Sequence, residues 1–317
     1  MKKTLLLSVV ASTMIMAGGD IAPAQEAAAP VAVSGWDFSG QAVIYYHTND
    51  KDDADLFDQD SSRANAGLQL RATNANLFNG IGAGVEVSSV STLGLQEDVV
   101  SGVMQTTAHD FDSAAMSDTG TGGWVSQAYL TGGFANTTVK LGRQELPKSL
   151  SPFAFSEGWN VFKNTFDAAL VVNTDLPDTL LVGAWVAKAN QNGLGADMND
   201  FASINPDHSI SCDETYPESG DICGEDDGVW MLTGQNKSIQ NLTLTGTWYH
   251  ANEYGGPSAD NLNVLWGDAQ YAVNGLALGL QGGTRMHDTF ADDATAWGAK
   301  VSGNVNGVAL TAAYSST

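Results

Sequence analysis

The chain has 317 residues and a formal net charge of −23, because 36 acidic residues outnumber 13 lysines and arginines. This excess of acid argues against binding to nucleic acid, or to an anionic membrane surface, through a basic patch. No apolar run reaches the ~18 residues that a transmembrane helix needs, so we expect no helical membrane span.

The N-terminus has the pattern of a secretory signal peptide. Lys2 and Lys3 precede an apolar run from Leu5 to Ala17, and a basic start followed by a short apolar segment directs export. We therefore divide the chain into a signal peptide over residues 1–24, cleaved after Ala17 or after Ala24, an Ala/Pro linker over 25–35 and one β-domain over 36–317.

From residue 36 onward, apolar and polar residues alternate over segments of about ten residues. In the first segment one parity is apolar and consists of Trp36, Phe38, Gly40, Ala42, Ile44 and Tyr46. A period of two predicts a β-strand with one apolar and one polar face. We count about thirteen such segments, near residues 36–47, 63–74, 80–92, 122–133, 137–146, 162–174, 178–190, 228–236, 240–251, 262–273, 275–287, 294–305 and 307–317. The two faces are ambiguous for 122–133, 178–190 and 228–236.

The connections between these segments alternate in length. Short turns, two of them the Asn-Gly pairs at 274–275 and 306–307, interleave with long loops, and Asn-Gly is a signal for a tight hairpin. The long loops are 48–62, 93–121, 147–161, 191–227, 252–261 and 288–293. Short turns on one rim and long loops on the other are typical of outer-membrane barrels.

The sequence therefore predicts an all-β fold, a transmembrane antiparallel up-and-down β-barrel in the bacterial outer membrane. Lipid offers backbone groups no hydrogen-bond partner, so spanning strands must be paired all round. A soluble β-sandwich or β-solenoid, whose strands also alternate, is the alternative. Single-chain bacterial barrels have even strand numbers, so we expect the chain to be truncated at its C-terminus.

The only two cysteines, Cys212 and Cys223, lie in a polar, acidic segment. An oxidising compartment favours a disulfide that closes this loop. Two free thiols are the alternative, and a metal site is less favoured because CxxC spacing is absent.

The run from Asp50 to Asp60 gathers carboxylates, which suit hard cations such as Ca²⁺ or Mg²⁺. It does not match the EF-hand loop, so a solvated acidic loop is the favoured interpretation. The weak candidates for metal ligands are Asp50, Asp52, Asp53 and Asp55. We expect no other cofactor.

Two stretches, about 50 residues together, resemble a known family. Residues 138–173 read TVKLGRQELPKSLSPFAFSEGWNVFKNTFDAALVVN, and SGWDFSGQAVIYYHT begins at Ser34. Both are similar to the major outer-membrane porins of campylobacteria and, more distantly, to OprD-type porins. The resemblance implies a trimeric barrel of about 16 to 18 strands, whose third outward loop, here 147–161, folds inward and narrows the pore.

A porin needs a polar lumen, a constriction and an electric field rather than a catalytic group. We expect bases and acids to oppose one another across the lumen and its constriction. The candidates are Arg63, Arg71, Lys140, Arg143, Lys148, Lys163, Arg285 and Lys300 among the bases and Asp37, Glu86, Glu157, Asp167 and Asp268 among the acids. Arg143 breaks the parity of its strand, so we interpret it as a bulge residue directed at the constriction.

Four of the long loops (48–62, 93–121, 191–227 and 288–293) hold 24 of the 36 acidic residues and one base, Lys51. An acidic vestibule attracts cations, so we expect a porin for small hydrophilic solutes and ions with a modest cation preference. We expect outer-membrane lipid and lipopolysaccharide as its partners, and the resemblance implies a homotrimer. A barrel-anchored adhesion protein is the alternative. An enzyme is less favoured, because no GxSxG, HExxH or GxxxxGK[ST] motif is present.

Overall fold

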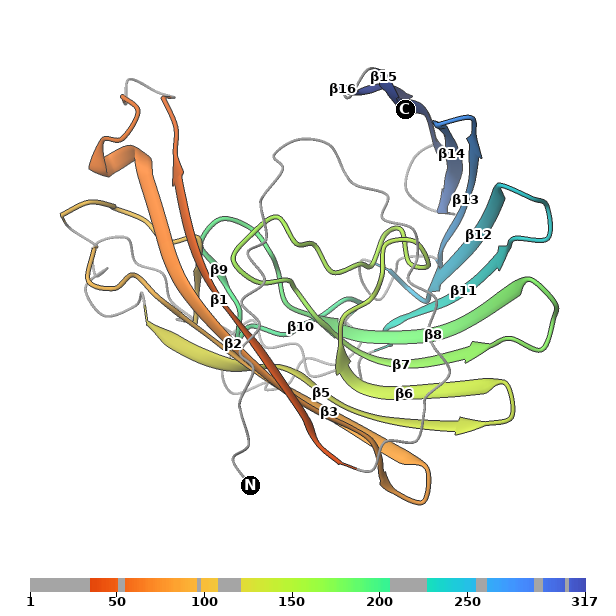
Figure 1. Cartoon of the computed structure of the whole chain (residues 1–317), viewed down its shortest axis with the longest axis horizontal. Coiled ribbons are helices and arrows are strands. Elements are labelled where there is room, and N and C mark those ends of the chain that lie inside the picture. The colour runs from red at the N-terminus through yellow and green to blue at the C-terminus, as the bar shows by residue number, and fades with distance from the viewer. Residues whose placement is uncertain are drawn as a thin grey trace.

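The computed structural model describes residues 35–50, 55–95, 98–107, 121–205, 227–254, 261–287, 293–305 and 308–317. Its main sheet is one antiparallel meander in which each long strand pairs with the next along the chain (Figure 1). The strands on this path are β1 (Asp37–Thr48), β2 (Ser62–Phe78), β3 (Ile81–Ser91), β5 (Gly122–Phe134), β6 (Thr137–Gln144), β7 (Phe166–Asn173), β8 (Thr179–Ala189), β11 (Val229–Asn236), β12 (Leu242–Ala251), β13 (Leu262–Val273), β14 (Leu276–His287), β15 (Ala294–Val305) and β16 (Val308–Ser316).

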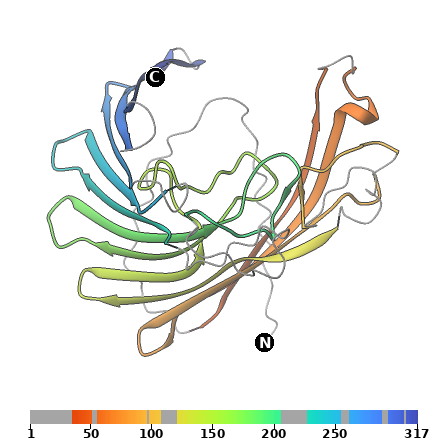
Figure 2. The same cartoon turned by 180° about the vertical axis from the view of Figure 1, so that it is seen from behind.

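All thirteen predicted segments coincide with these strands, so the all-β meander is confirmed. The sheet curves around a hollow, with β1 and β16 as its two edges (Figures 1 and 2). The short elements are β4 (Gln105–Thr106), which pairs in parallel with β9 (Ala196–Asp197), β10 (Ala202–Ser203), which pairs with β8, and a 3₁₀ turn at Gln59–Ser61. In the described ranges, no helix has the length and apolarity needed to cross a membrane.

The tight turns use the residues that their backbone requires. Asn274 and Gly275 between β13 and β14 have φ values of 49° and 79°, and Asn79 and Gly80 between β2 and β3 have φ values of 47° and 82°. Two consecutive positive φ values are the geometry of a type I′ hairpin, which Asn-Gly adopts at low cost. The predicted turn at 306–307 and both cysteines lie outside the described residues.

The distribution of polar and apolar side chains over the two faces of the sheet is the reverse of that in a soluble protein. Large apolar side chains stand exposed on the outer face, among them Phe38 at 79% and Ile44 at 80%. Polar side chains are buried on the inner face, where Glu86 is 2% and Gln127 is 3% exposed. A β-sandwich would bury the apolar face between its layers, so the structure favours a barrel wall over the soluble alternatives.

β-Bulges account for two of the three segments with ambiguous faces. In β5 the partner of Glu86 is Gln127 and that of Val87 is Val125, which leaves Ser126 as the extra residue. A bulge turns two successive residues toward one face, and Ser126 and Gln127 are both buried.

The second bulge lies in β8, where Ala187 is the extra residue between Val186 and Lys188. The third segment, β11, has no bulge: Trp230 and Leu232 are exposed, and Met231 is buried in an inner apolar cluster. Its apolar residues on both faces explain why the sequence pattern was ambiguous there.

Three segments of the long loops lie within the hollow of the sheet: 103–107, 145–165 and 190–198 (Figures 1 and 2). Gly102, just before the first of them, bridges to Arg63 on β2, and β10, after the last, extends the sheet beside β8. One apolar cluster joins Met104 and Met198 to Val161, Phe162 and the wall residue Trp124. A second joins Leu146 to the inner faces of β7, β8, β11 and β12. We call these three segments the inner segments; they position the site described next.

Candidate functional site

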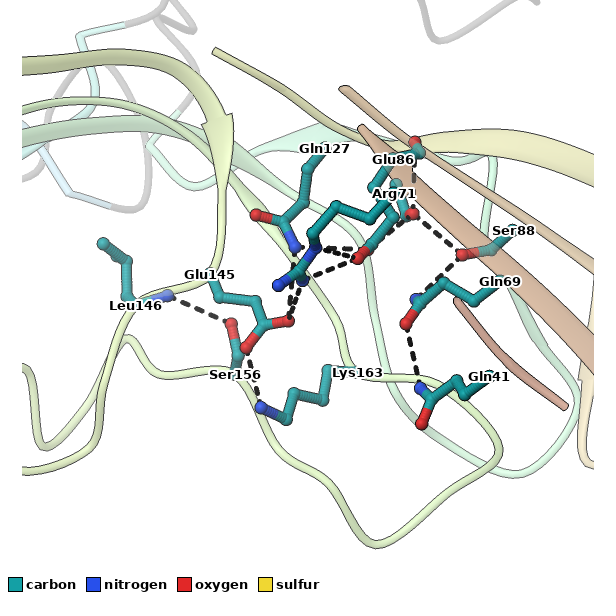
Figure 3. A network of polar contacts seen from close by, with 11 residues as sticks. Gln41, Gln69, Arg71, Glu86, Ser88, Gln127, Glu145, Leu146, Ser156 and Lys163 are labelled. Atoms are coloured by element: carbon teal, nitrogen blue, oxygen red, sulfur yellow. Dashed lines mark hydrogen bonds and ion pairs between the residues drawn. The ribbon is translucent and has the colours of Figure 1, made fainter. Parts of the chain in front are cut away.

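A network of charged and amide side chains lies on the inner face where the first strands meet the inner segments (Figure 3). Arg71 on β2 and Glu86 on β3 are register partners. The Arg71 Nε donates to Glu86 Oε2 at 2.7 Å. The Glu86 side chain is 2% exposed and that of Arg71 39%, so the acid is buried while the base reaches the open side.

The bulge in β5 completes the coordination of the buried carboxylate. Ser126 Oγ donates to Glu86 Oε1 at 2.8 Å, and Gln127 Nε2 donates to the same oxygen at 3.1 Å. A buried charge is tolerated when it is paired and hydrogen-bonded. The bulge therefore brings two hydrogen-bond donors to one acid.

Glu145 links this wall to the inner segment that it begins. Its Oε1 accepts from Arg71 Nη2 at 3.4 Å and from Gln127 Nε2 at 3.3 Å, and its Oε2 pairs with Lys163 Nζ at 2.7 Å. We call Arg71, Glu86, Ser126, Gln127, Glu145 and Lys163 the lumen network. Its bases and acids alternate along one surface (Figure 3).

A line of neutral polar side chains continues the network across the wall (Figure 3). Ser126 Oγ lies 2.8 Å from Ser88 Oγ, Gln69 Nε2 donates to Ser88 Oγ at 3.0 Å, and Gln41 Nε2 donates to Gln69 Oε1 at 2.9 Å. These contacts span β1, β2, β3 and β5.

The inner segment 145–165 crosses the hollow and is fixed at both ends. On one side Thr233 Oγ1 donates to the Leu150 carbonyl at 2.7 Å, and the Tyr249 hydroxyl accepts from Phe153 N at 3.2 Å. On the other side the rings of Phe162 and Trp124 are 5.9 Å apart. The inward folding of loop 147–161 that the resemblance implied is therefore confirmed.

Amide side chains join the three inner segments into one unit. Gln105 is fully buried, and its Nε2 donates to the Phe162 carbonyl at 2.7 Å and to Asn192 Oδ1 at 2.9 Å. From the wall, Asn65 Oδ1 accepts from the backbone nitrogens of Met104 and Gln105 at 2.6 and 2.9 Å. The segments are therefore held as a body rather than as independent loops.

The structure brings three of the predicted residues, Arg71, Glu86 and Lys163, into the lumen network. Lys140 lies close by on β6, with its Nζ 3.8 Å from the centre of the Tyr129 ring. The other candidates lie apart from the network. Lys148 Nζ lies 4.5 Å from the Phe155 ring centre, and Glu157 accepts a hydrogen bond from Trp159 Nε1. Arg63 Nη1 donates to the Val103 carbonyl, and Arg285 lies on β14.

Arg143 and Asp167 require a correction. They pair with each other through Nε–Oδ1 and Nη2–Oδ2 contacts of 2.8 and 3.0 Å. Phe166 and Ala168, on either side of Asp167, are buried in the inner cluster, and residues of a strand alternate between faces. The pair therefore lies on the outer face. The register of β6 is unbroken at Arg143, so it marks no bulge and is not directed at the constriction.

Glu145, Ser126 and Gln127 were missed from the sequence. Glu145 falls in the predicted strand 137–146 and is not among the candidates, whereas β6 ends at Gln144. Ser126 and Gln127 owe their common orientation to the bulge.

The predicted acidic loop offers no assembled metal site in the part of the chain that is described. Asp50 and Asp55 are described, whereas Asp52 and Asp53 lie outside the described residues. Among the described residues, no three His, Cys, Asp or Glu side chains are grouped as metal ligands.

Solved outer-membrane proteins share this fold. OccK8 (OprE) of Pseudomonas aeruginosa matches with a TM-score of 0.60 and 12% identity, over 88% of this chain and 67% of that chain. OccAB1 of Acinetobacter baumannii matches with a TM-score of 0.57 and 14% identity, over 88% and 63%. The outer membrane protein opdK of Pseudomonas aeruginosa matches with a TM-score of 0.54 and 12% identity, over 86% and 62%.

This chain thus spans 62% to 67% of the length of these three proteins. At such identities the likeness concerns the fold. It agrees with the OprD-type part of the expected resemblance, and the campylobacterial part stays a prediction. No protein-family model and no curated protein matches the sequence.

Proposed function

We propose that this chain forms the wall and the constriction of a water-filled channel in the bacterial outer membrane. Small hydrophilic solutes and ions would cross it by passive diffusion. The observation that carries the proposal is the distribution of side chains over the two faces of the sheet. Apolar side chains face outward, and the paired charges of the lumen network face the hollow. This arrangement suits lipid outside and water inside.

The lumen network supplies what a selective constriction needs. The side chains of Arg71, Glu145 and Lys163 are 39%, 30% and 47% exposed, so they are accessible from the hollow. Their opposite charges are held in place by hydrogen bonds, so they create a fixed local field across the path. Such a field orients dipolar solutes and replaces part of their water shell.

Charge outside the constriction supports a modest preference for cations. Of the 36 acidic residues, 24 belong to four long loops that hold only one base. An acidic vestibule raises the local cation concentration within a Debye length of ~8 Å at physiological salt. The bases of the lumen network act against this effect, so we propose a weak preference.

We further propose export through the signal peptide at residues 1–24, contact of the outer face with lipid and lipopolysaccharide, and assembly into a homotrimer. The apolar outer face supports the lipid contact. The trimer rests on the sequence resemblance alone. We propose no catalytic role and no bound cofactor, and a disulfide between Cys212 and Cys223.

Planar-bilayer recording of the protein under a KCl gradient tests the proposal. We expect discrete steps of current and a reversal potential of the sign that indicates cation preference. Protein that inserts and is folded but passes no current would contradict the channel and favour the barrel-anchored adhesion protein. A reversal potential of the opposite sign would retain the channel and contradict only the cation preference.

A further inference from the structure

The amide side chain of Gln105, on the inner segment 103–107, holds both backbone groups of Phe162 on the inner segment 145–165. Its Oε1 accepts from Phe162 N at 3.0 Å, and its Nε2 donates to the Phe162 carbonyl at 2.7 Å. The side chain thus makes the pair of contacts that a neighbouring strand would make. Its Nε2 also donates to Asn192 Oδ1 at 2.9 Å, so both amide hydrogens of the fully buried Gln105 are used.

The residue after Phe162 is Lys163, a base of the lumen network. Its Nζ pairs with Glu145 Oε2 at 2.7 Å (Figure 3). Phe162 is buried and its ring packs on Trp124, whereas the Lys163 side chain is 47% exposed. A lysine side chain is a flexible stem with a charge at its end, so the place of that charge depends on where the backbone is held. Gln105 holds the backbone one residue before this base.

Gln105 is in turn fixed to the strand that carries Arg71. Asn65 on β2 accepts through its Oδ1 from the backbone nitrogens of Met104 and Gln105 at 2.6 and 2.9 Å. A continuous path of contacts therefore leaves β2 and returns to it, running from Asn65 through Gln105, Phe162, Lys163 and Glu145 to Arg71. Because both ends of this path lie on one strand, Lys163 is restrained from two sides, by its backbone and by its ion pair.

We propose that Gln105 is a positioning residue for the ion selectivity of the channel, acting through the backbone of Phe162 on the charge of Lys163. This inference rests on the proposed channel function and adds to it a residue with no exposed surface of its own. Without the contacts to Phe162, the Lys163 ammonium moves away from Glu145. The local field then weakens, because the energy of a charge pair falls with distance, and the Glu145 carboxylate is left to attract cations.

The test is the reversal potential of Gln105→Met under a KCl gradient. Methionine keeps the length of the side chain and removes its hydrogen-bonding groups. We expect a shift toward cations of at least half the shift that Lys163→Met causes, although Gln105→Met removes no charge. In the double variant Gln105→Met should add nothing to the shift of Lys163→Met, because the charge through which Gln105 acts is gone. A residue that only stabilises the fold would change the number of channels and leave the reversal potential of each channel the same.

Two further variants complete the experiment. The matched control is Gln235→Met, since Gln235 is a buried amide on the wall strand β11 whose Nε2 donates to Thr245 Oγ1 on β12; it should leave the reversal potential unchanged. Asn65→Ala releases the backbone of Gln105 from β2 and should shift the reversal potential in the same direction as Gln105→Met. Where Gln105→Met forms no channels, Asn65→Ala, alone and combined with Lys163→Met, decides by the same criteria.

Failure of the inference is distinguishable from failure of the channel. An unchanged reversal potential in Gln105→Met, or a shift that adds in full to that of Lys163→Met, would overturn the positioning role and leave the channel intact. Unaltered protein that passes no KCl current would overturn the channel. In that case denaturant unfolding of the two single variants and the double variant in lipid vesicles decides whether Gln105 acts through Lys163. Losses of stability that do not add would support the coupling, and additive losses would overturn it.

Discussion

Arg71 and Glu86 form an ion pair between register partners in which the acid is buried and the base is partly open to the hollow, with Nε and Oε2 2.7 Å apart. Glu86 thus holds Arg71 in place, while Arg71 and Glu145 connect the wall to the inner segment. The position of Arg71 therefore depends on a carboxylate that is itself buried.

Replacement of this acid tests its role. Glu86→Gln removes one negative charge but retains the side-chain volume and a hydrogen-bonding amide. Arg71 then loses a paired charge, so we expect the reversal potential under a KCl gradient to shift toward anions and the folded state to lose about 1–3 kcal/mol. Asp37→Asn, at an exposed position on the first strand, is the control for loss of one charge; an equal shift there would argue against a special role for Glu86.

The assignment of faces predicts that arginine destabilises the protein to different degrees at two neighbouring positions. Leu70, 53% exposed on the outer face, should tolerate arginine poorly, with a loss of about 2–4 kcal/mol near the middle of a bilayer. Gln69→Arg, on the inner face, should cost much less because water is available there. Denaturant unfolding in lipid vesicles measures both. Equal losses would contradict the outward orientation of the apolar parity.

The outer position of the Arg143–Asp167 pair makes a prediction about conductance. Arg143→Ala removes a two-fold contact to Asp167, so we expect a loss of stability of about 1 kcal/mol. The reversal potential should stay unchanged, because the pair does not face the hollow. Lys163→Ala, which removes a charge from the lumen network, is the comparison that should shift it.

Tyr249 fixes the inner segment through its hydroxyl group. Tyr249→Phe removes the contacts of that hydroxyl with Ser151 Oγ and Phe153 N, each at 3.2 Å, so we expect a loss of about 1 kcal/mol and larger fluctuations of the open-channel current. Tyr314→Phe, on the exposed face of β16, is the control. Identical current noise in both variants would show that the anchor does not limit motion of the segment.

Asp175, in the short turn between β7 and β8, should show a measurable pH effect. Hydrogen bonds from Asn173, and secondly from Asn136, lower the pKa of Asp175 below its ordinary value of 3.8. The carboxylate thus stabilises the turn above pH 3.8, and this contribution is lost as the pH falls through the lower folded-state pKa. Carbon NMR of the carboxyl group measures the pKa, and Asn173→Ala should raise it. An unchanged pKa in that variant would contradict the assigned cause.

The alternation of residues determined the strands, because the side chains of a strand that separates lipid from water must change environment at every residue. The segment 294–305 was predicted to the residue, and so was 262–273. The faces of 122–133 and 178–190 could not be predicted, since a bulge shifts the parity without leaving a fixed residue signature. The prediction for Arg143 was wrong for a related reason. A charged residue on the apolar parity suggested a bulge, whereas the strand is regular and Asp167 on the next strand pairs with Arg143 on the outer face.

The sequence by itself also supplied Arg71, Glu86 and Lys163 as inward-facing charges, since each lies on the polar parity or in the loop that the resemblance identified. Only the tertiary structure decided that they share one network, because Glu145 joins them across 74 residues of chain. It also decided that Trp266 and Phe153 meet on the inner wall. Contacts between a wall strand and a loop folded inside it depend on how far each segment reaches in space, which a local pattern of polarity does not encode.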